Sequence, residues 1–145
     1  MHFLQALASK MHEMANDPAP NIIAGDFNIA RREIDRWNGG TRRKSGCTLE
    51  EQDWFDNLLA VGWHDVATAA ESSPVKWTNW PAKKYWPNQG WRLDYILAND
   101  AARLALRDFS TFNTFLCGTH APVAATLDLS GTPIALLAPQ STLAL

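Results

Sequence analysis

The sequence predicts a single-domain α/β fold, and three observations lead to that prediction. The chain has 145 residues, which is enough to bury a sizeable core. Hydrophobic residues make up 46% of the chain and charged residues 19%, a balance typical of soluble globular proteins. Segments with helical spacing of apolar residues are mixed with short runs typical of strands, which indicates an α/β or α+β arrangement.

Two helices are predicted from apolar spacing and end signals. Residues 2–15 carry apolar side chains three and four positions apart, and Asn16-Asp17-Pro18 ends that pattern. The second helix begins at a capping box formed by Thr48 and Glu51, and Gly62 closes it. The apolar faces consist of Leu4, Leu7, Met11 and Met14 in the first helix, and of Trp54, Phe55, Leu58 and Leu59 in the second.

Four strands are predicted. The unbroken apolar run at 21–25, bounded by proline and glycine, is typical of a buried central strand. Composition predicts strands at 92–97 and 104–109, and alternating apolar residues predict another at 123–129. We expect 31–47 to be a long polar loop and 68–91, which is rich in Trp, Pro, Asn and Lys, to be an irregular surface segment.

The charge of the chain is nearly balanced, with a formal net charge of −2 at pH 7. A nucleic-acid-binding protein of such low charge needs a local basic patch. One candidate lies between positions 31 and 44, where charge alone favours a solvated basic loop over a nucleic-acid surface. It contains Arg31, Arg32, Arg36, Arg42, Arg43 and Lys44.

The two cysteines and the chain ends indicate the compartment. Cys47 and Cys117 are far apart and in no CxxC pattern, which suggests a reducing environment and no zinc site. No secretory signal pattern is visible, and the apolar tail at 131–145 is too short and too broken by glycine and proline to span a membrane. We therefore expect a soluble, cytoplasmic protein.

Four polar residues lie near the ends of predicted strands. Asp26 and Asn28 directly follow the first strand, where ligands bind in α/β sheets. Asp94 lies in an apolar strand, where a carboxylate is costly unless it is paired or metal-bound, and His120 precedes the last strand. Simpler alternatives are a turn for Asp26 and Asn28, a structural acceptor for Asp94 and an ordinary loop histidine for His120.

The order of five motifs favours the functional interpretation of these four residues over the simpler alternatives. GDFNIA at 25–30, GWHD at 62–65, the Trp-rich segment, GWRLDYIL at 90–97 and THAPV at 119–123 follow one another. This order resembles the exonuclease III / apurinic-apyrimidinic endonuclease branch of the endonuclease/exonuclease/phosphatase superfamily, from the first helix to Asp128. The resemblance implies the C-terminal part of a four-layered α/β sandwich, two packed β-sheets flanked by helices, with the N-terminal half absent. We accordingly assign 1–130 to a partial domain and 131–145 to a tail.

The resemblance also implies a DNA repair nuclease that hydrolyses phosphodiester bonds with Mg²⁺ (or Mn²⁺). Asp26 matches an aspartate that activates or positions the attacking water, and Asn28 matches an asparagine that holds the phosphate and helps bind the metal. Asp94 matches an aspartate that orients the catalytic groups. His120 matches a histidine that contacts the scissile phosphate or the metal site. The implied metal-binding set is thus Asp26, Asn28 and His120.

The same resemblance suggests where DNA would be bound. Trp77 and Trp80 occupy the place of an aromatic DNA-contacting loop. Asn88 and Arg92, just before Asp94, are expected to bind substrate or to support the cleft.

Two departures from the family pattern bear on function. Gly118-Thr119-His120 stands where the family usually has Ser-Asp-His, and loss of such a partner typically costs about 10–100-fold in metal affinity or activity. The N-terminal half, which carries further site residues and strands, would have to come from a complementing chain. Three hypotheses remain: a nuclease completed by that chain, a catalytically inactive DNA-binding remnant, and a protein-interaction fragment without a nucleic-acid role.

Overall fold

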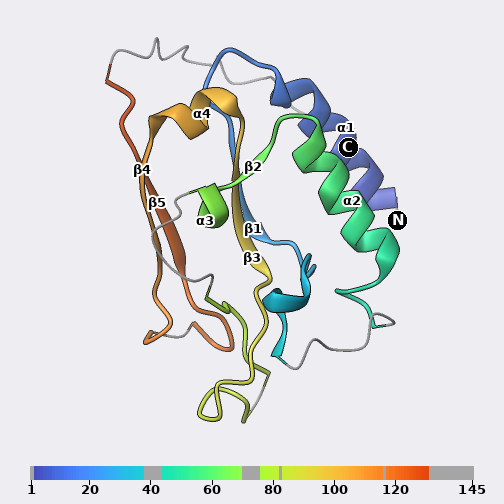
Figure 1. The fold of residues 1–145 in the computed structure, drawn as a ribbon, viewed down its shortest axis with the longest axis vertical. Coiled ribbons are helices and arrows are strands. Elements are labelled where there is room, and N and C mark those ends of the chain that lie inside the picture. Colours follow the sequence, from blue (N-terminus) through green and yellow to red (C-terminus); the bar gives the residue numbers. More distant parts are fainter. Residues whose placement is uncertain (1, 38–43, 70–75, 82, 116, 131–145) are drawn as a thin grey trace, which may run out of the picture.

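The computed structural model describes residues 2–37, 44–69, 76–81, 83–115 and 117–130. It confirms the α/β prediction, with helices beside two antiparallel sheets (Figure 1). The helices are α1 (His2–Ala15), the 3-10 turn η1 (Glu33–Asp35), α2 (Leu49–Ala60), α3 (Val66–Ala69) and α4 (Asp100–Ala105). The strands are β1 (Ile22–Asp26), β2 (His64–Asp65), β3 (Asp94–Ala98), β4 (Leu106–Thr111) and β5 (Val123–Leu127).

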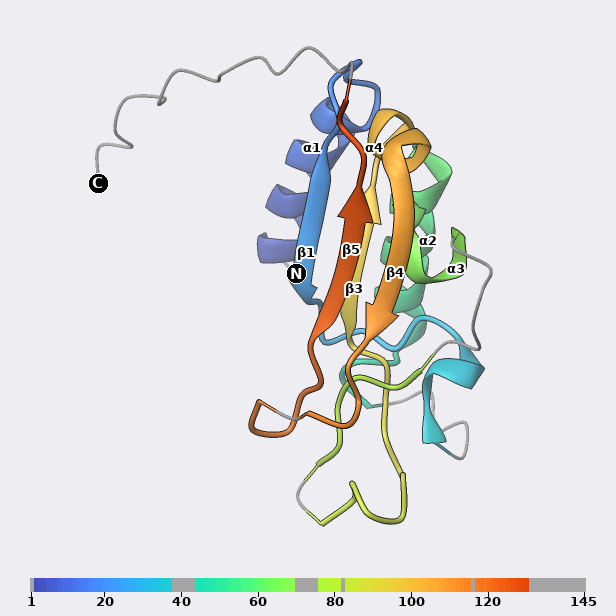
Figure 2. The same ribbon diagram turned by 90° about the vertical axis from the view of Figure 1, so that its left-hand side faces the viewer.

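Three layers are stacked around strand β3. The first sheet has the order β1-β3-β2, and the second consists of β4 and β5. Figure 2 shows the β4–β5 sheet in front of β1 and β3, with α1 and α2 behind them. Because side chains alternate across a strand, β3 serves both faces: Tyr95 and Leu97 pack toward the helices, and Ile96 and Ala98 pack toward the second sheet.

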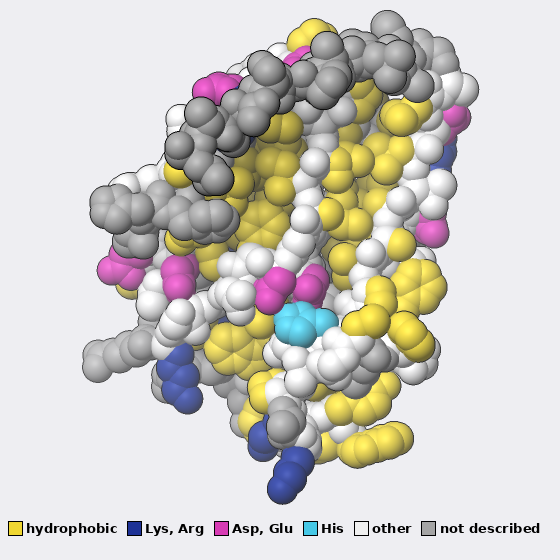
Figure 3. Space-filling view, turned by 180° about the vertical axis from the view of Figure 1, so that it is seen from behind, with side chains coloured by type: hydrophobic (Ala, Val, Ile, Leu, Met, Phe, Trp, Pro, Cys, Tyr) yellow, Lys and Arg dark blue, Asp and Glu magenta, His cyan; other side chains and the backbone are white. Residues whose placement is uncertain are grey.

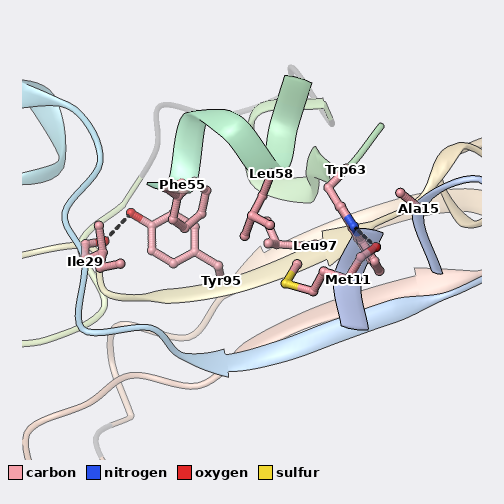
Figure 4. Packing of buried hydrophobic residues seen from close by; sticks show 8 residues of the cluster. All are labelled: Met11, Ala15, Ile29, Phe55, Leu58, Trp63, Tyr95 and Leu97. Carbon is pink, nitrogen blue, oxygen red and sulfur yellow. Dashed lines mark hydrogen bonds between the residues drawn. The ribbon is translucent and has the colours of Figure 1, made fainter. Parts of the chain in front are cut away.

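The larger core lies between the two long helices and the first sheet (Figure 4). Phe55 and Leu58 come from α2, and Met11 comes from α1. The two polar atoms in this cluster are satisfied, since Tyr95 Oη donates to Ile29 O at 2.8 Å and Trp63 Nε1 donates to Met11 O at 2.9 Å. The predicted apolar faces of both helices thus point inward.

The ends of α2 follow the predicted signals. Thr48 Oγ1 accepts from the Glu51 amide at 3.3 Å, and the Glu51 carboxylate accepts from the Thr48 amide at 2.9 Å. This reciprocal pair is the capping box expected from the sequence. Gly62, with φ of +110°, follows the helix in a backbone conformation that residues with a Cβ rarely adopt.

The strand predictions need two corrections. β1 is not a buried central strand: among the described residues it pairs only with β3, and Ile22 is 40% exposed. The buried central strand is β3 instead, because it is flanked by strands on both edges and packed on both faces. The strand expected at 104–109 begins only at Leu106, because residues 100–105 form α4, capped by Asn99.

The segment expected to be a polar loop at 31–47 contains a buried ion network. Arg92 Nε donates to Asp35 Oδ1 at 2.9 Å, and Arg92 Nη2 donates to Asp65 Oδ2 at 2.7 Å. All three side chains are almost fully buried. Burial by itself raises the pKa of Asp35, but the charges of Arg92 and Arg32 outweigh it and hold that pKa below its usual value. The network joins η1, β2 and the start of β3.

Part of the surface seen from the side opposite to the view of Figure 1 is apolar. Figure 3 shows hydrophobic side chains gathered over a hollowed area on the face away from α2, with a histidine against acidic side chains at its lower end. Within the described residues, no helix is long and apolar enough to cross a membrane.

Candidate active site

Two aspartates lie opposite each other at one end of the first sheet. Asp26 ends β1 and Asp94 begins β3, and the antiparallel register pairs them directly. The amide of Phe27 extends the ladder by donating to Leu93 O at 3.0 Å. Residues 68 positions apart in the sequence are therefore held side by side by backbone hydrogen bonds.

His120 lies against both carboxylates. Its Nδ1 is 2.9 Å from Asp94 Oδ2, and its Nε2 is 3.9 Å from Asp26 Oδ2. The first distance is a hydrogen bond and the second is a close approach. A carboxylate only accepts, so Nδ1 of His120 carries the hydrogen that Asp94 receives. The structure thus brings Asp26, Asp94 and His120 together at one end of the first sheet.

Asn28 completes the turn that follows β1. Its amide N–H donates to Asp26 Oδ1 at 2.8 Å, and its side-chain Nδ2 donates to Asp26 Oδ2 at 3.2 Å. The backbone of Asn28 has φ of +52°, a left-handed conformation that asparagine tolerates better than most residues. The turn interpretation and the functional one are therefore both compatible with this geometry, since the turn directs both side chains toward the same place.

Thr78 joins the three segments that carry the site. Its buried Oγ1 accepts from the amides of Leu93 and Asp94, each at 3.0 Å, and its carbonyl accepts from the Ala121 amide at 2.7 Å. Thr78 thereby fixes the start of β3 relative to the segment that contains His120. Sequence reasoning missed this role, because a threonine in an irregular segment gives no signal of long-range backbone contacts.

Asn79 is a second residue that sequence reasoning missed. Its Nδ2 lies 2.7 Å from His120 Nε2 and 3.2 Å from Thr119 Oγ1. Backbone bridges tie Asn79 to Trp91 on one side and to His120 on the other. The side chain that touches His120 on the side away from Asp94 is thus an amide.

Comparison with known proteins identifies the fold. The family model described as "Endonuclease/Exonuclease/phosphatase family" matches residues 1–112. This chain belongs to that family. The residues matched include Asp26, Asn28 and Asp94, while His120 lies beyond them.

Curated relatives in the family carry nuclease names. An exodeoxyribonuclease of Streptococcus pneumoniae is 31% identical over 115 residues, which cover 76% of this chain and 42% of that protein. The DNA repair nuclease APEX1 of Danio rerio is 33% identical over 108 residues, covering 72% of this chain and 35% of the relative. The chain thus spans less than half the length of these two relatives.

Solved structures in the family support the same fold. A 3′-5′ exonuclease (NExo) of Neisseria meningitidis is 26% identical, with a TM-score of 0.77 over 88% of this chain and 52% of that one. An AP endonuclease of Archaeoglobus fulgidus, 19% identical, has a TM-score of 0.75 and shows the fold alone.

Two of the four residues expected to bind substrate, Trp80 and Arg92, are buried in this chain. Trp80 is 3% exposed and its Nε1 donates to Asn88 Oδ1 at 3.1 Å, so its ring cannot stack on a base. Arg92 is 2% exposed and paired with Asp35 and Asp65, so it cannot contact substrate directly. Both predictions of substrate contact are corrected here. The interpretation of Arg92 as a support for the cleft agrees with its place two residues before Asp94.

The other two expected substrate-binding residues stay accessible. Trp77 is half-buried, and its Nε1 donates to Ile34 O at 3.2 Å. Asn88 is exposed in a turn with φ of +51°. The most exposed aromatic side chain in this region is Trp86, which is 90% exposed and lines an open pocket together with Trp80, Tyr85 and Asn113.

The described part of the basic stretch is mostly paired or buried. Arg31 forms an ion pair with Asp56, and Arg32 donates to Asp35. Arg36 is buried, whereas Lys44 is exposed. Arg42 and Arg43 lie outside the described residues. Among the described residues the stretch therefore resembles a structural segment more than a basic patch.

The residues at the site fit part of a metal centre. Asp26 and Asn28 offer a carboxylate and an amide oxygen, and magnesium in proteins takes oxygen ligands from only one or two carboxylates, with water and phosphate completing the shell. Within the described residues there is no group of three His, Cys, Asp or Glu side chains placed to hold a metal ion. Both ring nitrogens of His120 are already engaged, which disfavours the prediction that it is a ligand.

Proposed function

We propose that this chain supplies one half of the active site of a divalent-metal-dependent phosphodiesterase that acts on DNA. The single observation that carries the proposal is that the side chains of Asp26, Asp94 and His120 meet, although they come from the end of β1, the start of β3 and the segment before β5. The names of the relatives, which include exodeoxyribonucleases and a DNA repair nuclease, support DNA as the substrate and hydrolysis as the reaction. The expected location in the cytoplasm belongs to the same proposal.

Each site residue has a proposed role. Asp26 accepts a proton from the attacking water, for which a carboxylate general base contributes on the order of 10²–10⁴-fold. Asn28 donates to or orients a phosphate oxygen near the same point. Asp94 accepts from His120 Nδ1 and so fixes the plane of the ring, which faces the scissile phosphate.

A bound Mg²⁺ or Mn²⁺ would neutralise the phosphodiester charge and polarise the phosphorus–oxygen bonds. Asp26 and Asn28 are the residues of this chain that would hold it. The remaining protein ligands would come from outside the described residues, which place no third His, Cys, Asp or Glu side chain so that a metal ion could be held.

A complementing polypeptide is part of the proposal. Among the described residues no strand pairs with the outer edge of β1, and hydrophobic side chains lie exposed over a hollowed area beside the site (Figure 3). Large exposed apolar areas mark sites of association. The chain also spans only 42% and 35% of the two relatives named above. We therefore expect the isolated chain to unfold at lower temperature than an average domain of this length, and a partner that covers this face to raise its melting temperature.

The test is cleavage of a labelled duplex with one abasic site, in Mg²⁺, by the wild-type chain with and without the N-terminal half of a family relative. Asp26→Ala is the site variant, and Asp53→Ala, on the exposed face of α2, is the matched control. We expect metal-dependent incision that is lost in Asp26→Ala and kept in Asp53→Ala. Duplex binding without incision under both conditions would favour the DNA-binding remnant, and absence of binding would favour the protein-interaction fragment. Either result would overturn the proposal.

A further inference from the structure

In the hydrogen bond between Asn79 and His120 the donor and the acceptor can be assigned. Nδ1 of His120 faces the Asp94 carboxylate at 2.9 Å and must carry a hydrogen. In the neutral ring Nε2 is then an acceptor, and the atom of Asn79 that lies 2.7 Å from it is the amide nitrogen, a donor. The second hydrogen of that amide nitrogen points to Thr119 Oγ1 at 3.2 Å. Each nitrogen donor in these contacts thus meets an acceptor.

We propose that Asn79 is a positioning residue that donates to Nε2 of His120 and, opposite Asp94, fixes the plane of the ring. Its meaning for catalysis rests on the proposed function. Asp94 accepts at one edge of the ring and Asn79 donates at the other, so the imidazole cannot rotate while both hydrogen bonds persist.

The chain of hydrogen bonds ends on an exposed hydroxyl. Thr119 receives a hydrogen from Asn79, so its own hydroxyl hydrogen is free to point outward, and the residue is exposed. Donation to a hydroxyl oxygen strengthens that hydroxyl as a donor. The outward group at this position is thus a neutral donor, which suits an anionic phosphate oxygen, instead of a carboxylate, which would repel it.

The backbone around Asn79 is held independently of its side chain. The amide of Asn79 donates to Trp91 O and the amide of Trp91 donates to Asn79 O, each at 2.8 Å. The neighbouring Thr78 and Trp80 amides are also bonded, to Trp91 O and Thr119 O. Truncation of the Asn79 side chain therefore removes the contact with the ring while these backbone bonds keep the segment in place.

The first test uses carbethoxylation by diethyl pyrocarbonate, which attacks an unprotonated imidazole nitrogen with a free lone pair. The rate at each histidine of the full chain is followed by peptide mass spectrometry. His12 is an internal reference, because its Nδ1 is bonded to Ala8 O and no described residue bonds its Nε2. We expect His120 to react about tenfold more slowly than His12 in the wild type, and about as fast as His12 in Asn79→Ala, in line with the loss of about one hydrogen bond.

Two matched variants separate the amide contact from general loosening. Asn113→Ala removes the same side chain from a neighbouring segment and should leave His120 protected. Thr119→Val removes the second acceptor of the Asn79 amide but keeps the first, and should also leave His120 mostly protected. Equal rates at His120 and His12 in the wild type, or equal acceleration in all three variants, would overturn the proposal.

A second readout needs neither reagent nor enzymatic activity. The ¹⁵N shifts of the His120 ring, at a pH where the imidazole is neutral, should show a protonated Nδ1 and a hydrogen-bonded, unprotonated Nε2. In Asn79→Ala only the Nε2 shift should move, to that of a free acceptor. A protonated Nε2 in the wild type would refute the assigned tautomer. Because these readouts are independent of DNA cleavage, a failed cleavage assay would remove the catalytic meaning of the contact without touching the contact itself.

Discussion

Asp26 and Asp94 are direct partners in the antiparallel ladder between β1 and β3, and His120 lies between their carboxylates. The carboxylate of Asp94 bonds only to the ring of His120 among the described side chains. Directly opposed residues of an antiparallel pair have a fixed spacing between their Cα atoms. The pairing of Asp26 with Asp94 therefore fixes how far apart the two carboxylates can lie.

Asp94→Asn should lower the rate of DNA cleavage by the complemented enzyme about 10–100-fold, because the ring of His120 loses the charged partner that orients it. The shape of the side chain is kept, so the melting temperature should change little. Asp100→Asn is the control, since Asp100 pairs with His64 at 2.7 Å in the same way but on α4. Equal activity of Asp94→Asn and Asp100→Asn would contradict the orienting role.

Arg92→Leu should destabilise the chain by about 3–5 kcal/mol, because it leaves Asp35 and Asp65 buried without a cation. Urea unfolding followed by tryptophan fluorescence measures the change. Arg107→Ala removes a surface pair with Asp128 and should cost at most about 1 kcal/mol. Similar losses in both variants would mean that the buried network contributes no more than an exposed ion pair.

Acid should weaken the fold through Asp35. Its pKa in the folded protein lies below the ordinary value of 3.8, so the ionised form is favoured by folding. The stabilisation is therefore complete above that value and is lost as the pH falls below it toward the folded pKa. The free energy of unfolding, measured from about pH 6 down to about pH 3, should fall in the acid range, and the fall should be smaller in Asp35→Asn.

Trp80→Ala should affect the stability of the fold, whereas Trp86→Ala should affect the binding of single-stranded DNA. Trp80 is buried, so its truncation should cost about 3–5 kcal/mol, whereas truncation of the exposed Trp86 should change stability by about 0.5 kcal/mol or less. If Trp86 stacks on a base, its loss should weaken single-strand binding by about 1–3 kcal/mol. Thermal unfolding and fluorescence anisotropy give the two quantities, and a stable Trp80→Ala protein would disprove the burial argument.

Thr119→Asp should strengthen Mn²⁺ binding, because it adds a carboxylate next to His120 at a surface that holds two others. Isothermal titration calorimetry on the full chain measures the affinity. Thr114→Asp places the same charge on an exposed residue of the preceding loop, which lines the pocket beside Trp86, and serves as the control. An unchanged affinity in Thr119→Asp would show that this chain alone does not assemble the metal site.

The sequence by itself determined the local elements and which residues are candidates for the site. Periodicity and a capping box were sufficient for α1 and α2, since these signals act within a few residues. The motif order was sufficient to single out Asp26, Asn28, Asp94 and His120. The prediction placed Asp26 at the carboxyl end of a buried strand, and it was wrong about the strand, because a short apolar run has the same composition at an edge as at the centre of a sheet.

Only the tertiary structure decided which side chains face the site and which are buried. Trp80 and Arg92 looked suited to bind DNA, yet packing and the paired charges of Asp35 and Asp65 place them inside. Asn79 gave no signal in the sequence, because its contact with His120 spans 41 positions and depends on backbone bridges formed after the chain has folded. Periodicity reports which way a side chain points along its own element, whereas burial and long-range partners depend on what the rest of the chain brings against it.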